Sequence, residues 1–444
     1  MAEADRATAQ SWFAEHALLP QGHARDVLFD VAGGRFTAVT PNASQAGAER
    51  LPGIALPGFA NVHSHAFQRA LRGRTHDSGG TFWSWRERMY AVAERLTPDS
   101  YLELARATYA EMALTGVTAV GEFHYLHHAP GGVPYADPNA MGEALLQAAR
   151  EAGIRIALLD ACYLAGGLTG SGHTPLEGVQ LRFGDGDVEG WAGRFARLAG
   201  SDTAVIGAAL HSVRAVPAAS IRAATAAAAG VPLHVHLSEQ PAENDVCRAF
   251  YGCSPAALLQ NEGALSPLTT AVHATHVSQD DVALLGDTSA QACLCPTTER
   301  DLADGIGPAL QLHEAGVRLS LGSDQHAIID LLEEARSLEM DERLGSGRRG
   351  RFAPRELLAA LTRHEALGFP EAGRLAVGER ADLVAVRLDS ARTAGSDPAQ
   401  VLFSATAADV DTVLVDGRLI VKEGRHRLGD IGRALQAAVE PLWR

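Results

Sequence analysis

The sequence contains little cysteine, no long hydrophobic run and comparatively little positive charge, and each shortage excludes a class of protein. Its 444 residues include five cysteines, an odd and scattered set that predicts no disulfide framework and suits a reducing location. No apolar run approaches the roughly 20 residues needed to cross a bilayer. The amino terminus is acidic and has no hydrophobic signal region. We therefore expect a cytoplasmic protein without a membrane partner.

The scarcity of positive charge limits the partners of the chain. Lysine and arginine total 38 against 53 aspartates and glutamates, which gives a net charge of −15. Such a protein repels polyanions, so nucleic acid is not an expected partner. An anionic substrate would need arginines close to its binding site to overcome the same field. The hydrophobic content of 46% is ordinary for a globular protein, and the length predicts one large domain with a smaller companion.

Short strand-like segments occupy both ends of the chain. They cover residues 11–18, 27–31 and 35–39 near the start, and 381–388 and 412–421 near the end, with Gly and Asn turns between them. The middle of the chain has a different rhythm. We therefore expect residues 1–56 and 372–444 to pair into one small β-sandwich-like domain, with residues 57–371 inserted between its halves.

The middle of the chain alternates apolar runs with helical segments. Helices are predicted over 100–114, which Thr97 and Pro98 open, and over 140–152. Eight buried strands with helices between them predict an α/β fold, a (β/α)₈ barrel with long loops. A doubly wound open sheet is the alternative, but no Gly-x-Gly-x-x-Gly follows the first strand. The eight runs are 54–62, 116–123, 154–162, 204–210, 231–237, 269–274, 290–295 and 317–321.

Two connections in the barrel are unusually long, at residues 70–97 and 164–198. Loops at the carboxyl face of such a barrel build its active site. The first connection contains the aromatic and basic segment 82–90, Phe-Trp-Ser-Trp-Arg-Glu-Arg-Met-Tyr. An exposed segment of this kind would be adhesive, so we expect it to form a folded lid or a subunit contact.

Groups that bind metals or move protons gather at the carboxyl ends of six of the eight predicted strands. A lone histidine on an apolar face is usually a packing residue, but that interpretation does not explain so many at equivalent positions. Strand alternation puts His63 and His65, which are separated by one residue, on the same face of their strand. The groups are His63 and His65; Glu122 and His124; His211 and Arg214; His234, His236 and Glu239; His273 and His276; and Asp324.

This inventory suits one divalent metal held by three imidazoles and a carboxylate, with a position left for water. Alternation does not discriminate between His234 and His236. We prefer His236 as the ligand, because it is closer to the mouth of the barrel and to Glu239. Asp324 is the natural carboxylate ligand. We expect Asp301 and Asp304, in a polar loop, to be solvated. The fourth strand offers no lysine that could bridge two metals, which favours one ion.

The motifs in this inventory resemble the amidohydrolase superfamily, and most of all its mononuclear-zinc deaminase branch. They are Pro-Gly-Phe-x-Asn-x-His-x-His at 57–65, His-x-x-Glu at 236–239, His273 and Gly-Ser-Asp at 322–324. The resemblance covers nearly the whole chain, including the split β domain. More narrowly, segments 63–70, 82–86, 122–125, 211–214, 239–240 and 295–299 resemble the formimidoylglutamate deiminase group of that branch.

The resemblance implies an enzyme that hydrolyses N-formimidoyl-L-glutamate to N-formyl-L-glutamate and ammonia, in histidine degradation. The substrate is a small dicarboxylate with an amidine-like carbon, and arginine binds carboxylates bidentately. One divalent metal ion per subunit, expected to be zinc, and a homodimer are also implied. The implied residues are His63, His65, His236 and Asp324 for the metal; Glu239, His273 and Asp324 for catalysis; and Gln68, Arg86, Tyr125 and Arg214 for the substrate.

The implied catalytic roles agree with the chemistry. A zinc ion lowers the pKa of its water to about 7. Asp324 is expected to take the proton of that water, and Glu239 to carry a proton to the departing nitrogen. His273 is expected to hydrogen-bond the attacking oxygen as charge develops on it. Iron and manganese are open as metals, because ligand type alone discriminates poorly between them.

Other interpretations stay open at this point. A related deaminase of a purine or pyrimidine base would favour aromatic stacking and amide contacts over Arg86 and Arg214. An inactive homologue that acts as a binding protein need not keep the complete ligand set. Pairing of Arg86 with Glu87 or Glu94 of its own helix and a packing role for Tyr125 are the alternatives for these two residues. His124, His211 and His276 have no assigned roles, and Cys293 and Cys295 are expected to be buried small hydrophobes.

Overall fold

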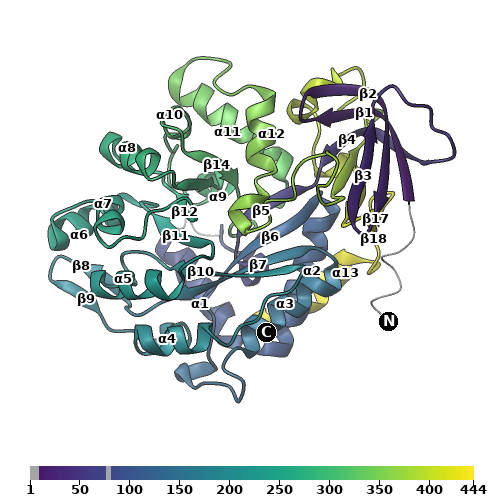
Figure 1. Ribbon diagram of the computed structural model, residues 1–444. Coiled ribbons are helices and arrows are strands. Elements are labelled where there is room, and N and C mark those ends of the chain that lie inside the picture. The colour runs from purple at the N-terminus through teal and green to yellow at the C-terminus, as the bar shows by residue number, and fades with distance from the viewer. Residues whose placement is uncertain (1–9, 77–81) are drawn as a thin grey trace.

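The computed structural model describes residues 10–76 and 82–444, which form a parallel barrel and a separate sheet (Figure 1). The barrel sheet has the order β14-β13-β12-β11-β10-β7-β6-β5, and its neighbouring strands are parallel. The predicted (β/α)₈ barrel is therefore confirmed. Its strands are β5 (Phe59–Ser64), β6 (Val117–His124), β7 (Arg155–Cys162), β10 (Ala204–Leu210), β11 (Leu233–Leu237), β12 (Thr269–His273), β13 (Gln291–Leu294) and β14 (Arg318–Leu321).

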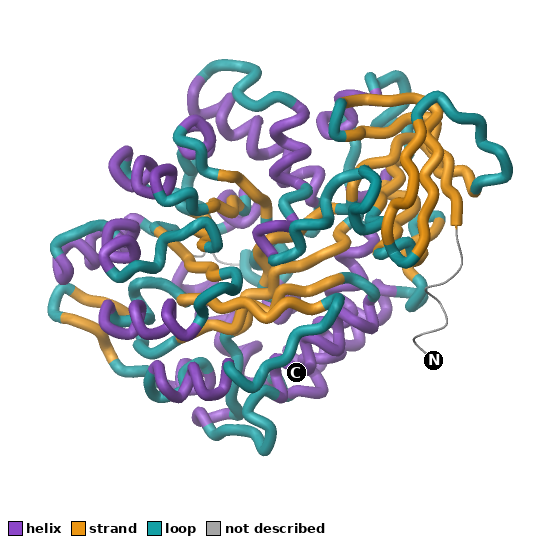
Figure 2. The backbone as a smooth tube through the Cα atoms, viewed as in Figure 1, coloured by secondary structure: helices purple, strands orange, loops and turns teal. Residues whose placement is uncertain are grey.

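Helices surround the barrel strands, as the tube view shows (Figure 2). α2 begins with Pro at its first turn after the N-cap Thr97, whose side chain accepts from the Ser100 backbone N–H, as the sequence predicts. The helices are α1 (Phe82–Arg95), α2 (Pro98–Leu114), α3 (Ala140–Ala152), α4 (Val188–Phe195), α5 (Ala218–Ala227), α6 (Pro241–Tyr251), α7 (Pro255–Asn261), α8 (Gln279–Asp287), α9 (Pro296–Asp301), α10 (Ala309–Glu314), α11 (Leu331–Ser346), α12 (Pro354–Leu361) and α13 (Ile431–Val439).

The second sheet joins the two ends of the chain, and Figure 1 shows its purple and yellow strands side by side. Its order is β18-β17-β16-β15-β4-β1-β2-β3, and its own apolar core is separate from that of the barrel. We propose that the two units divide near residues 56 and 371. The strands are β1 (Gln10–Leu19), β2 (Gly22–Ala32), β3 (Arg35–Thr40), β4 (Glu49–Pro57), β15 (Leu383–Val386), β16 (Val410–Val415), β17 (Arg418–Lys422) and β18 (Arg425–His426).

The first predicted strand, residues 54–62, is wrong as a single element. The chain leaves the terminal sheet at the end of β4, crosses at Gly58 and enters the barrel as β5. The Gly58 N–H donates to Asp382 O at 3.2 Å, on the sheet side of the crossing. A Cβ at Gly58 would lie 2.4 Å from Thr118 Oγ1, so a side chain here would collide with β6. Apolar periodicity alone does not show this change of sheet.

Folded elements occupy the long connections and the carboxyl end, where the sequence predicted loops or strands. α1 lies in the first long connection; residues 77–81 of the same connection lie outside the described residues. A hairpin of β8 (Gly167–Thr169) and β9 (Gly172–Thr174), together with α4, lies in the second. α13 packs against α2 through an apolar face that includes Ile431 and Leu435, four residues apart. Within the described residues, no helix is long and apolar enough to span a membrane.

A buried ion pair links the barrel to the terminal sheet. Arg155 at the start of β7 donates through Nη1 to Asp382 Oδ1 at 3.0 Å and through Nη2 to Oδ2. Both side chains are fully buried. The same guanidinium lies 3.1 Å from Asp416 Oδ1, in the β16–β17 turn. Removal of one partner of such a pair leaves an uncompensated buried charge.

We expect Arg155→Met to lower the free energy of unfolding by about 3–5 kcal/mol, because Asp382 would lose its buried cation. Denaturant unfolding followed by circular dichroism measures this change. Arg150→Met, at an exposed position on α3, is the matched control and should change stability by less than about 0.5 kcal/mol. Equal stability of the two variants would contradict the proposed link.

Candidate active site

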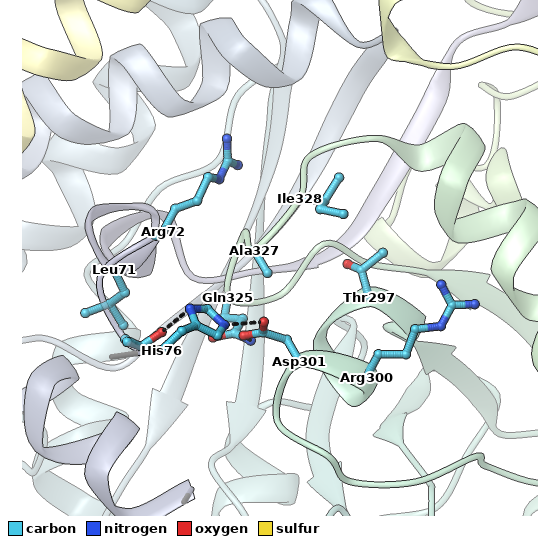
Figure 3. Close-up of a pocket in the computed structure, with 11 residues that line it drawn as sticks. Leu71, Arg72, His76, Thr297, Arg300, Asp301, Gln325, Ala327 and Ile328 are labelled. Atoms are coloured by element: carbon cyan, nitrogen blue, oxygen red, sulfur yellow. Dashed lines mark hydrogen bonds and ion pairs between the residues drawn. The ribbon is translucent and has the colours of Figure 1, made fainter. Parts of the chain in front are cut away.

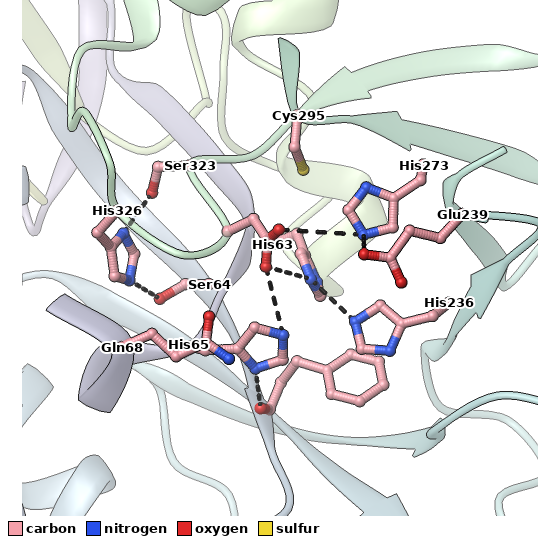
Figure 4. A network of polar contacts seen from close by, with 12 residues as sticks. His63, Ser64, His65, Gln68, His236, Glu239, His273, Cys295, Ser323 and His326 are labelled. Carbon is pink, nitrogen blue, oxygen red and sulfur yellow. Dashed lines mark hydrogen bonds and ion pairs between the residues drawn. The ribbon is translucent and has the colours of Figure 1, made fainter. Parts of the chain in front are cut away.

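Four side chains from three strand ends converge at the carboxyl face of the barrel (Figure 4). His63 lies on β5 and His65 directly after it; His236 lies on β11 and Asp324 follows β14. His63 Nε2 is 3.3 Å from Asp324 Oδ1 and 3.2 Å from His236 Nε2. His65 Nε2 is 3.4 Å from the same Asp324 oxygen. The structure thus brings together all four residues predicted to bind the metal.

Backbone carbonyls orient two of these imidazoles. His65 Nδ1 lies 2.9 Å from Phe123 O, and His236 Nδ1 lies 2.8 Å from His211 O. A carbonyl only accepts, so each Nδ1 carries the proton and each Nε2 presents its lone pair to the shared centre. This arrangement is typical of histidines that bind metals.

The donor atoms fit a small divalent metal ion. Zinc binds imidazole nitrogens at about 2.0–2.1 Å, so neighbouring donors of a tetrahedral site lie roughly 3.3 Å apart. The observed separations of 3.2, 3.3 and 3.4 Å agree with that spacing. His63 Nε2 and His236 Nε2 face one another in a buried position, where a shared metal ion would bind both nitrogens.

Burial sets the charge of these groups. It lowers the pKa of His63 to about 3 and lowers the pKa of His65 and His236, so the three rings are neutral. Burial by itself would raise the pKa of Asp324, but its hydrogen bond with His63 and the nearby rings hold that pKa below the usual range. Neutral imidazoles and an ionised carboxylate are the forms that bind a cation.

Glu239 and His273 lie beside the four donors. His273 Nε2 is 4.0 Å from Glu239 Oε1 and 4.0 Å from Asp324 Oδ2, and its Nδ1 is 3.5 Å from Glu299 Oε1. Burial alone would lower the pKa of His273, but these three carboxylates raise it to about 10. His273 is therefore a hydrogen-bond donor near neutral pH.

Left-handed backbone conformations mark the same region. Ser238, His273, Ala274, Asp324 and His326 have φ values of 51°, 69°, 50°, 42° and 62°. Such values cost free energy in residues other than glycine, and they cluster at functional sites where the surrounding structure enforces them. Here they redirect the chain as it leaves β11, β12 and β14, so that side chains after the strands turn over the barrel mouth.

The residues predicted to bind substrate line one small cavity with the catalytic set. Its volume is about 70 Å³, below the roughly 300 Å³ of a typical ligand pocket, so a substrate fits only if wall side chains move. α1 forms one wall through part of the segment that was predicted to form a folded lid or a subunit contact. The lining residues are His65, Gln68, Trp85, Arg86, Met89, Tyr90, Tyr125, Tyr163, Phe183, His211, Arg214, His236, Glu239, His273, Leu302 and Asp324.

Polar groups of this cavity are arranged around two arginines. Arg214 Nε is 3.2 Å from Glu243 Oε2, and its Nη2 is 3.7 Å from Glu239 Oε2. The Arg86 guanidinium carbon lies 5.5 Å from the Tyr90 ring centre. Burial lowers the pKa of His211, and the charges of Arg214 and Arg86 lower it further. Arg86 and Arg214 therefore both lie close enough to His211 to disfavour its charged form.

Gln68 and Tyr125 form a second polar pair in the cavity. Gln68 Nε2 donates to the Tyr125 hydroxyl at 3.0 Å, which in turn donates to Met89 Sδ at 3.8 Å. The amide oxygen of Gln68 is buried and has no hydrogen-bond partner among the described residues. A residue of the cavity lining therefore carries a buried acceptor without a partner among the described residues.

Several wall residues were not predicted from the sequence. Tyr163 and Phe183 come from the second long connection and Leu302 from the end of α9. Tyr163 directly follows a barrel strand, and this position could have indicated its place at the site. Phe183 and Leu302 had no such signal in the sequence, because an apolar residue in a long loop has many possible neighbours.

Other expectations about single residues met different outcomes. Cys293 and Cys295 are buried, as predicted. The solvated position expected for Asp304 is wrong: it is 4% exposed, Gln240 Nε2 donates to it, and burial raises its pKa to about 8.

Two of the histidines without assigned roles lie away from the metal donors. The ring of His276 contacts the Asp304 carbonyl at 2.8 Å. His124 lies in a separate buried group with His127 and Asp160.

A second cavity of about 300 Å³ lies on the same face of the barrel (Figure 3). Asp301 lines this cavity. Its Oδ1 lies 2.8 Å from His76 Nε2, and its Oδ2 accepts from Gln325 Nε2 at 2.7 Å. Gln325 directly follows Asp324. These contacts connect the segment before α1 to α9 and to the loop after β14, so Asp301 is structural as well as partly exposed.

Comparison with known proteins agrees with the fold. Residues 54–420 match the amidohydrolase family, and residues 10–53 match the N-terminal domain of formimidoylglutamate deiminase HutF. The first match covers most of the chain, including the barrel and every residue of the candidate site. The chain belongs to the amidohydrolase family.

Individual relatives are similar along most of their length. A formimidoylglutamate deiminase of Pseudomonas aeruginosa is 39% identical over an alignment of 437 residues that covers 93% of this chain and 95% of the relative. An 8-oxoguanine deaminase of the same organism is 33% identical and covers 86% of this chain and 85% of its own. The crystal structure of an amidohydrolase from Brucella melitensis superimposes with a TM-score of 0.90 at 33% identity, over 98% and 100% of the two chains.

We expect His236→Gln to weaken metal binding at least 100-fold, roughly the upper limit for loss of an outer contact, because an amide does not replace the imidazole donor. Competition with a chelator, followed by elemental analysis, measures this. His234→Gln is the matched control. Its ring lies on the same strand one layer deeper, with Nε2 3.1 Å from Ala366 O. Retained metal in His236→Gln, or loss in His234→Gln, would contradict the ligand choice.

Proposed function

We propose that the chain is a metal-dependent hydrolase of carbon–nitrogen bonds that converts N-formimidoyl-L-glutamate and water to N-formyl-L-glutamate and ammonia. The observation that carries this proposal is the pairing of a three-histidine, one-aspartate centre with two arginines in one cavity. The 39% identity to a formimidoylglutamate deiminase over almost the whole length supports the same substrate.

The reaction requires water to add to the formimidoyl carbon and the nitrogen to leave as ammonia. The metal would be held by His63, His65, His236 and Asp324. When bound, it would supply the Lewis acidity that lowers the pKa of water to about 7. Asp324 accepts a proton from the attacking water through its second carboxylate oxygen. We propose zinc as the native metal, because imidazole and carboxylate donors at tetrahedral spacing suit it.

Glu239 and His273 complete the proton transfers. Glu239 moves a proton to the departing nitrogen, so that ammonia leaves instead of an amide anion. His273, raised in pKa by its carboxylate neighbours, donates a hydrogen bond from Nε2 to the oxygen on which negative charge develops. Their 4.0 Å separation lets both groups reach the same carbon centre from one side.

Recognition of the substrate is assigned to four other residues that line the cavity. Arg86 and Arg214 bind the two carboxylates, which overcomes the net charge of −15 locally. The free Oε1 of Gln68 accepts from a formimidoyl N–H, and the Tyr125 hydroxyl supports that amide from behind. A nucleobase has no carboxylate for these arginines, although an 8-oxoguanine deaminase is a relative at 33% identity.

We further propose a cytoplasmic homodimer with one metal ion per subunit. All five cysteines are free, which supports a reducing compartment. The dimer follows from the family resemblance, and size-exclusion chromatography with light scattering tests it.

Ammonia release from N-formimidoyl-L-glutamate tests the substrate directly. We expect turnover of this compound by zinc-loaded protein and none of guanine, cytosine or adenosine in parallel reactions. Chelated protein is the control and should be inactive. Turnover of a nucleobase in place of formimidoylglutamate would move the protein to the nucleobase deaminases, and no turnover with bound metal would favour a binding protein.

We expect Glu239→Gln to lower kcat by about 10²–10⁴-fold, the usual contribution of a general acid–base, with metal content unchanged. Steady-state kinetics and elemental analysis measure the two quantities. Glu314→Gln, at an exposed position on α10, is the control and should keep full activity. Near-normal kcat in Glu239→Gln would refute the proton-transfer role.

A further inference from the structure

A buried acid outside the cavity contacts both halves of the site. Glu243 lies in the first turn of α6, and its side chain is fully buried. Its Oε2 is 3.2 Å from Arg214 Nε, and its Oε1 accepts from the Ser238 N–H at 3.2 Å. Arg214 follows β10, whereas Ser238 follows β11. One carboxylate therefore joins the ends of two neighbouring barrel strands.

The contact with Arg214 holds that guanidinium in one place. Nε is the atom that Glu243 binds, while Nη2 is directed at Glu239, 3.7 Å from Oε2. Burial by itself would lower the pKa of Arg214, but Glu243, and after it Glu239, raise it. A carboxylate bound at Nε leaves the terminal nitrogens to meet other carboxylates, which here are Glu239 and a carboxylate of the substrate.

The contact with Ser238 supports the turn that presents Glu239. Ser238 has a φ of 51°, a conformation that needs enforcement from its surroundings. Besides the bond from its N–H to Glu243, its hydroxyl donates to Asn244 Oδ1 at 2.8 Å. Asn244 Nδ2 in turn donates to His276 O at 2.7 Å. The first turn of α6 thus anchors the backbone immediately before Glu239.

We propose that Glu243 is a positioning residue for the reaction, which aligns Arg214 for a substrate carboxylate and holds the turn that carries Glu239. This inference rests on the proposed function, because it assigns Arg214 to a carboxylate of the substrate. Glu243 itself does not line the cavity and contacts none of the four proposed metal ligands in the described part of the chain. Its influence on the reaction therefore passes through Arg214 and Ser238.

The isosteric variant Glu243→Gln separates this role from simple packing. A glutamine keeps the volume and one acceptor oxygen, but it does not accept from both partners and has no charge. Arg214 would then have Glu239 as its nearer carboxylate and would turn toward it. The substrate carboxylate would have to compete for the guanidinium, so KM should rise by about tenfold while kcat falls less, as expected for a charge-assisted contact.

A double-mutant cycle measures whether the effect passes through Arg214. The proteins are wild type, Glu243→Gln, Arg214→Met and the double variant, each zinc-loaded and assayed with N-formimidoyl-L-glutamate. We expect Glu243→Gln to lower kcat/KM by about tenfold in the wild-type background and by less than about threefold in Arg214→Met. Asp245→Asn removes a charge from an exposed position on the same helix, and it should behave as wild type.

Equal losses in both backgrounds would overturn the alignment of Arg214 by Glu243, and no loss in either background would overturn the inference as a whole. Metal content and the thermal unfolding midpoint of each variant show whether it has folded. Should Glu243→Gln not fold, Glu243→Asp takes its place in the same cycle, because it keeps the charge but shortens the reach to Arg214. Absence of turnover by the wild type would refute the proposed function, whereas wild-type turnover with additive variants refutes only the role of Glu243.

Discussion

The backbone pairing that closes the barrel between β5 and β14 is the constraint on which the site depends. The Asp324 N–H donates to His63 O at 3.0 Å, and the His65 N–H donates to Asp324 O at 3.1 Å. These two bonds place three of the four proposed metal ligands along one seam. The approach is close enough that a Cβ at Gly322 would lie 2.7 Å from the Cβ of His63. Folding of the barrel therefore builds the donor set, and a bound ion would in turn stabilise the closed barrel.

Charge is distributed so that an acidic protein can hold an anionic substrate. The net charge of −15 is opposed in the cavity by Arg86 and Arg214, and part of the charge of Arg214 is balanced by Glu239 and Glu243. This balance stabilises the partly buried guanidinium of Arg214 without a substrate. The cavity is small and α1 forms one of its walls, so these charges lie in a partly desolvated place where each interaction is stronger than in bulk water.

Sequence patterns predicted the barrel and the convergence of His63, His65, His236 and Asp324, because the ends of parallel strands meet at one edge. They did not reveal the crossing at Gly58, where two strands of different sheets form one apolar run. The sequence patterns also did not predict helix α13 or the burial of Asp304, because both depend on neighbours that are distant in sequence. Phe183 is a further example, because only the folded course of the second long connection brings it to the cavity wall.

The central claim is that one metal ion at the β5–β14 seam activates water for hydrolysis of formimidoylglutamate. Titration of the metal-free protein with zinc, with ammonia release followed at each step, tests it most directly. The account predicts no activity without metal and a linear rise to a plateau at one equivalent per chain. Full activity in the metal-free protein, or a plateau only at two equivalents, would contradict it.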